Sequence, residues 1–112
     1  MTRRRPGRLR AARAWAFDMF GQAEREAASG DEIALETRAL VRLATTHVTE
    51  AAADAAEWAY RAGGSDALRI PSRLQRAWRD IHAGTQHLFV DDRTLVDGAR
   101  VLLGLAPKGI VI

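Results

Sequence analysis

Residues 60–87 read YRAGGSDALRIPSRLQRAWRDIHAGTQH and divide the chain into a long first part and a shorter second part. Gly63-Gly64 closes a run without Gly or Pro, and glycine commonly ends helices. Pro71 suits the first turn of a helix, because the backbone donor that proline lacks would be unpaired there. This stretch therefore predicts a long helix, a glycine turn and a further helix that continues to about Phe89. The mainly apolar face of that further helix contains Leu74, Trp78, Ile81, Thr85 and Leu88.

Upstream of this stretch the pattern is also helical. A first helix is predicted over 9–28, ended by Ser29-Gly30, and Asp31 is the candidate N-cap of a second helix over 32–62. Its apolar stripe turns to alanine and keeps no heptad of branched residues, which favours a packed bundle over a coiled coil. The stripe consists of Leu40, Leu43 or Ala44, Val48, Ala51 or Ala52, Ala55 and Ala59.

Downstream, Asp91-Asp92 could cap a fourth helix that Gly104 and Pro107 end. Its expected buried side consists of Leu95, Val96, Ala99, Leu102 and Leu103. We find no alternation long enough for a sheet, so the predicted fold is all-α, an antiparallel helical bundle. We expect a basic disordered tail over 1–8, the bundle over 9–106, and an apolar tail over 107–112. That last tail is expected either to dock on another subunit or to be disordered.

Composition limits the classes of protein. Cysteine is absent, so disulfides and thiolate metal sites are excluded. No apolar run approaches the roughly 18 residues of a membrane span, and the basic start lacks a secretory apolar region. We therefore expect a soluble, cytoplasmic protein without a membrane partner.

The positive charge lies at one end. The formal net charge is +3, but six of the 17 basic residues precede residue 14. Without them, 11 basic residues (17 less 6) face 14 acidic ones, a net charge of −3. A basic arm can bind phosphates, yet the rest of the chain is acidic, so nucleic-acid binding is the third choice among the functions considered.

The order of motifs resembles a known family. Gly63-Gly64, Arg79-Asp80, Gly84-Thr85 and a final helix over 91–104 follow one another as in the C-terminal helical domain of the acyl-CoA dehydrogenase superfamily. The likeness runs from about Ala11 to the end of the chain. PSRLQRAWRDIHAGTQH resembles in particular the flavin-dependent monooxygenase branch of that superfamily.

The resemblance implies roles for single residues. Many acyl-CoA dehydrogenases carry their catalytic carboxylate directly before the Gly-Thr pair, where this chain has Ala83, so dehydrogenation by that residue is excluded. His87 matches a histidine that lies beside flavin and substrate in the monooxygenase branch, which implies a catalytic residue. From the sequence pattern alone, His87 is better explained by a solvent-facing or hydrogen-bonded histidine, and only the resemblance makes the functional role equally plausible.

The resemblance also implies a flavin, FMN or FAD, contacted by Gly63, Gly64 and Ser65. In relatives the equivalent turn approaches the flavin of a neighbouring subunit, where a missing Cβ allows close contact. From the residues alone, the two glycines are sufficiently explained as a helix end and turn. No two histidines have the spacing of a metal-ligand pair, so no metal site is predicted.

The function implied is that of a truncated chain. We expect the C-terminal domain of a flavin-dependent oxidoreductase of monooxygenase type, contributing to the flavin and substrate pocket and to subunit contacts. The N-terminal and central domains of such an enzyme do not fit in 112 residues. We therefore expect little or no catalysis from the isolated chain, and a bound flavin only if the isolated chain retains it. A homo-oligomer, dimer or tetramer, is expected. The alternative is a non-catalytic helical oligomerisation module.

Overall fold

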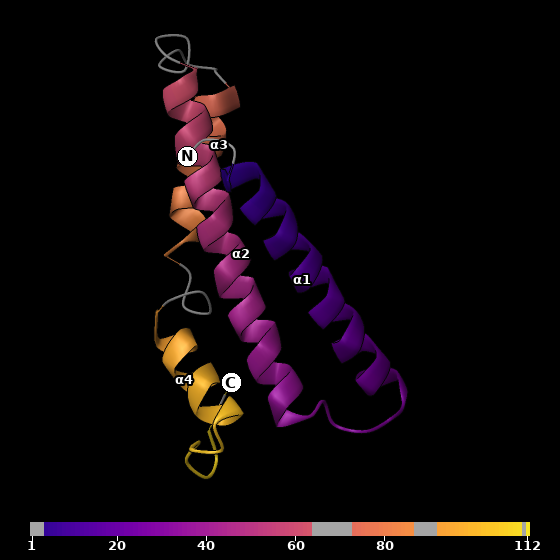
Figure 1. Ribbon diagram of the computed structural model, residues 1–112. Coiled ribbons are helices and arrows are strands. Elements are labelled where there is room, and N and C mark those ends of the chain that lie inside the picture. The colour runs from indigo at the N-terminus through magenta and orange to yellow at the C-terminus, as the bar shows by residue number, and fades with distance from the viewer. Residues whose placement is uncertain (1–3, 64–72, 87–91, 111) are drawn as a thin grey trace.

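Helix α2 (Leu35–Ala62) is the central element of the structure, and the other helices pack on it (Figure 1). α1 (Arg4–Ala28) runs antiparallel along one side, while α3 (Arg73–Gly84) and α4 (Asp92–Leu102) follow one another along the other side. The computed structural model describes residues 4–63, 73–86, 92–110 and 112. Within these ranges every regular element is a helix, which confirms the predicted all-α antiparallel bundle.

The core lies between α1 and α2. Ala16, Met19 and Ala44 are buried together, and partly buried apolar side chains surround them, namely Trp15, Leu40, Val41 and Val48. The first part of the predicted stripe of α2, namely Leu40, Ala44 and Val48, is thereby confirmed. Alanines on facing helices allow the two backbones to approach closely, and the methionine fills the remaining space.

α1 begins at Arg4, earlier than the predicted start at Leu9. The helix thus takes in most of the segment 1–8 that we expected to be a disordered tail. Pro6 falls within the first turn, where backbone donors have no helical acceptor and a proline therefore removes no hydrogen bond. Arg8 binds Asp54 of α2 at 2.5 Å, so part of the basic arm is paired within the chain.

The connection between α1 and α2 differs from the prediction. α2 begins at Leu35 with Ala34 at the N-cap, so Asp31 is not the cap. Instead, the Glu26 carboxylate of α1 accepts hydrogen bonds from the Ala34 backbone N–H at 2.9 Å and the Thr37 hydroxyl at 2.5 Å. A side chain eight residues upstream therefore satisfies a donor at the start of α2, as a local cap would.

α4 turns the opposite side toward α2 from the one predicted. Thr94 and Gly98 are buried, whereas the residues expected to be buried are exposed: Leu95, Val96, Ala99, Leu102 and Leu103. The reason is the close approach at Gly98, where an added Cβ would lie 2.7 Å from Cγ of Leu43 on α2. The apolar side of α4 is left without cover among the described residues.

The chain has an elongated shape with a large surface. Its radius of gyration is 16.8 Å, against about 13 Å for a compact domain of this length. Its accessible surface is 8083 Å², against about 6,100 Å² for a free monomer of this mass. The excess of about 2,000 Å² is comparable to the surface that a stable protein interface buries. No described helix is long and apolar enough to cross a membrane.

Candidate functional site

Gly63 is the one predicted site residue within the described part of the chain. It is the C-cap of α2, and its N–H donates to the Ala59 carbonyl at 2.9 Å, which confirms the predicted helix end. Its φ of −69° and ψ of −14° are open to every residue, so the backbone conformation does not itself require glycine. Gly64, Ser65 and His87 lie outside the described residues.

A polar and aromatic cluster lies next to this glycine end of α2. The Trp78 ring of α3 stacks on Tyr60 of α2, with ring centroids 5.3 Å apart, and lies 4.6 Å from the His82 ring. The Trp78 indole N–H donates to Oε2 of Glu57. We call Glu57, Tyr60, Trp78 and His82 the α2–α3 cluster; it joins the end of α2 to the face of α3.

Glu57 supplies the carboxyl group of this cluster. The hydrogen bond from Trp78 holds the pKa of the Glu57 carboxyl below its usual range, and Arg61 contributes through a hydrogen bond at 2.9 Å and its charge. Partial desolvation works in the opposite direction and is outweighed. Sequence reasoning missed Glu57, although the four-residue spacings from Glu57 to Arg61 and from Trp78 to His82 place each pair on one helix face.

α3 ends before its predicted length. Gly84 is its last residue, and the Thr85 hydroxyl donates to the His82 carbonyl at 2.6 Å, satisfying a terminal acceptor. The predicted Gly-Thr motif, Gly84 and Thr85, thus lies at the end of this helix. Ala83 before it is exposed and has no group that could remove a proton.

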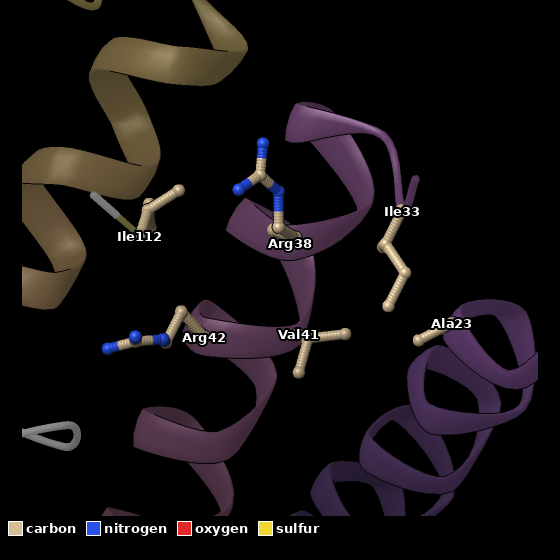
Figure 2. Close-up of a pocket in the computed structure, with 6 residues that line it drawn as sticks. All are labelled: Ala23, Ile33, Arg38, Val41, Arg42 and Ile112. Carbon is tan, nitrogen blue, oxygen red and sulfur yellow. The ribbon is translucent and has the colours of Figure 1, made fainter. Parts of the chain in front are cut away.

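The described cavities lie elsewhere. One of about 120 Å³ is lined by Ala23, Ile33, Arg38, Val41, Arg42 and Ile112. Figure 2 shows Ile33 and Val41 turned toward α1, with the two arginines on the side of Ile112. Ile112, the last residue of the expected apolar tail, thus lines a cavity of its own chain.

A second, open groove of about 280 Å³ lies along α1 and α2. Arg13, Ala16, Phe17, Phe20 and Val48 line it, and the Arg13 guanidinium lies 5.0 Å from the centre of the Phe17 ring. Neither cavity reaches Gly63, and both are smaller than the roughly 300 Å³ at which ligand pockets begin. Among the described residues, no three metal-ligating side chains gather.

Residues 4–92 match the family described as "Acyl-CoA dehydrogenase, C-terminal domain". The chain is 30% identical to the indole-3-acetate monooxygenase of Pseudomonas putida over 88% of its own length and 25% of the relative's. It is 35% identical to the pigment production hydroxylase of Rhodococcus erythropolis over 72% of its own length and 21% of the relative's. The chain thus spans about a quarter of the length of the curated relatives it matches.

Solved structures of a hydroxylase and a monooxygenase are also similar to this chain. The crystal structure of the 3-HSA hydroxylase from Rhodococcus sp. RHA1 superposes with a TM-score of 0.77 at 27% identity, covering 96% of this chain and 29% of that one. The HsaA monooxygenase from M. tuberculosis gives a TM-score of 0.77 at 28% identity, covering 98% and 30%. The chain belongs to the acyl-CoA dehydrogenase C-terminal domain family and groups with its monooxygenase branch.

Proposed function

We propose that this chain is the C-terminal domain of a flavin-dependent monooxygenase, in which it forms one wall of the flavin and substrate pocket and makes subunit contacts. The observation that carries the proposal is the superposition on two solved relatives, a hydroxylase and a monooxygenase. Nearly all of this chain is covered in each case, but less than a third of the relative. The pocket would then be completed by domains equivalent to the remainder of those proteins.

In this proposal the glycine end of α2 contacts the flavin, FMN or FAD. Gly63, Gly64 and Ser65 are the contacting residues, because glycine without a Cβ allows the backbone to approach a ligand closely. His87 gives or takes a proton at the substrate or the flavin, a role for which a histidine suits neutral pH. A bound flavin would supply the redox chemistry of oxygen insertion.

The subunit contacts are assigned to the uncovered apolar sides of the bundle. Leu103, directly after α4, is 72% exposed, and Phe17 on α1 is 63% exposed beside the open groove. Apolar residues that share one helix face and remain exposed mark surfaces for other chains or domains. The excess surface of about 2,000 Å² is sufficient for a standard interface.

Absorbance and mass of the purified chain test this proposal together. FMN and FAD are added separately at equal concentrations, and the spectrum is recorded across a size-exclusion peak whose mass is measured by light scattering. The expected result is a flavin band that elutes with an oligomer and is weakened by His87→Ala. A colourless oligomer with either flavin would contradict the flavin contact.

A second candidate function is a non-catalytic helical oligomerisation module. The exposed apolar side of α4 favours it, because that surface needs a partner whether or not a flavin is bound. The same experiment separates the two candidates, since the module forms an oligomer without any flavin band.

A further inference from the structure

The Glu57 carboxylate of α2 makes side-chain polar contacts with α3. Trp78 of α3 lies half-buried on α2, with its ring on Tyr60 and its N–H on Glu57. None of the described side chains of α3 is fully buried. The ring stack and the charge-assisted hydrogen bond therefore help to hold α3 on α2.

Both oxygens of Glu57 are engaged. Oε1 accepts from Nε of Arg61 at 2.9 Å, and Oε2 accepts from Trp78 and faces Nε2 of His82 at 3.8 Å. Arg61 shares α2 with Glu57, whereas Trp78 and His82 belong to α3. One carboxylate thus joins two helices that are connected through residues outside the described part.

His82 is oriented within this contact. Its Nδ1 lies 2.7 Å from the Trp78 carbonyl, which can only accept, so Nδ1 carries the hydrogen. In the neutral ring, Nε2 then has no hydrogen and cannot donate to Glu57, which agrees with the long distance of 3.8 Å. Among the described residues, Arg61 and His82 are the charged or titratable groups that act on this carboxylate.

The placement of these contacts connects them to the proposed site. Glu57 lies less than two helical turns before Gly63, and His82 lies five residues before His87. We propose that Glu57 is a positioning residue, whose carboxylate fixes α3 through Trp78 against the glycine end of α2. The inference rests on the proposed function in so far as that glycine end contacts a flavin.

The first test uses the indole N–H signals of the three tryptophans in ¹H–¹⁵N NMR spectra of the full chain, with Trp78 assigned by Trp78→Phe. The Trp78 signal is expected to move as acid protonates Glu57, because the bond from its N–H to a charged acceptor then weakens. The signals of Trp15 and Trp58 are expected to stay. A Trp78 signal that does not respond to acid would overturn the proposal, and this measurement requires no variant at Glu57.

The second test compares Glu57→Gln with Glu50→Gln. Glutamine keeps the size and an acceptor but removes the charge, and Glu50 lies two turns earlier on the same face of α2 without a described polar partner. Glu57→Gln is expected to move the Trp78 indole signal, abolish its pH dependence and shift the Gly63 amide signal. Glu50→Gln should change none of these. Equal effects of the two variants would contradict the proposal, because Glu57 would then act only as a surface charge.

FMN is the probe that connects the two proposals. If the wild-type chain binds FMN, Glu57→Gln should weaken binding about tenfold and Glu50→Gln should leave it unchanged. Unchanged FMN binding in Glu57→Gln would overturn the positioning role. If the wild-type chain binds no FMN, the flavin contact fails, and the role of Glu57 stands or falls on the Trp78 and Gly63 signals.

Discussion

The two sides of α2 are held by different forces. Toward α1 the contact is apolar and closely packed, and every buried apolar side chain named in the core belongs to these two helices: Ala12, Ala16, Met19, Ala39, Ala44 and Ala51. On α4 the buried positions are Thr94 and Gly98, and the clearest link to α3 is the Glu57–Trp78 hydrogen bond. The first side is thus a helical hairpin with its own core cluster, whereas the second leaves apolar residues of α4 exposed.

This difference shows how stability and recognition are divided within the chain. Apolar burial between α1 and α2 supplies stability that needs no other molecule. α4 buries a threonine and a glycine but leaves its leucines exposed, so its apolar surface adds little to the stability of the described chain. Substitutions on the two sides should therefore differ in both size and kind of effect.

Truncation of Met19 should have the largest effect. Met19 is 7% exposed between α1 and α2, and Met19→Ala should lower the free energy of unfolding by about 2–4 kcal/mol, because it removes buried apolar contacts and leaves a cavity. That is a large share of the about 5–15 kcal/mol typical of a domain. Urea unfolding followed by circular dichroism measures it. A loss below about 1 kcal/mol would show that the hairpin is not the stable half.

Gly98 tests the close approach of α4 to α2. An alanine there would place its Cβ 2.7 Å from Cγ of Leu43, so Gly98→Ala should cost about 1–3 kcal/mol of unfolding free energy despite the better helix propensity of alanine. Gly7→Ala in α1 is the matched control, because nothing lies within 4 Å of the added Cβ. The control should be neutral or slightly stabilising. If the two variants unfold alike in urea, α4 does not pack as described.

Glu26 gives the hairpin a dependence on acid. The Thr37 hydroxyl first, and then the Ala34 N–H and Gln22, hold the pKa of the Glu26 carboxyl below its usual range. A lowered pKa stabilises the folded state at neutral pH, and this contribution is lost as pH falls through the folded-state pKa. Glu26→Gln should therefore lower the melting temperature at pH 7 more than at pH 3. Glu24→Gln, an exposed change on the same helix, should not show that difference.

Local sequence patterns correctly predicted features that depend on a single helix or on one pair of packed helices. The stripe around Ala44 was predicted correctly because α1 covers it, and the helix end at Gly63 was predicted correctly because a glycine after a long helical run is a strong stop signal. Asp31 failed as a cap because Glu26, from another helix, reached the N-terminus of α2 first. A contact between two helices cannot be predicted from the short stretch of sequence around either residue.

The failure on α4 has a more general cause. Periodicity identifies the apolar side of a helix but not what covers it, and the described residues leave that side of α4 exposed. The Glu57–Trp78 contact spans 21 residues across the glycine turn, so no spacing rule could identify it. The roles of Gly64, Ser65 and His87 stay predictions, because these residues lie outside the described ranges.

Substitutions on the exposed apolar side of α4 should have the smallest effect on stability, and they test directly whether this side packs within the chain. Val96 and Leu103 are 51% and 72% exposed, so Val96→Ser with Leu103→Ser should change the unfolding free energy of the monomer by no more than about 0.5 kcal/mol. If this surface joins copies of the chain, the same double variant should convert the oligomer to monomer in light scattering, whereas Ala27→Ser on the exposed side of α1 should not. A loss of monomer stability above about 1 kcal/mol would mean that the leucine side of α4 packs within the chain, and the contrast between the two sides of α2 would then be wrong. An oligomer that persists in the double variant would instead leave the hairpin contrast intact and move the subunit contact to the groove beside Phe17.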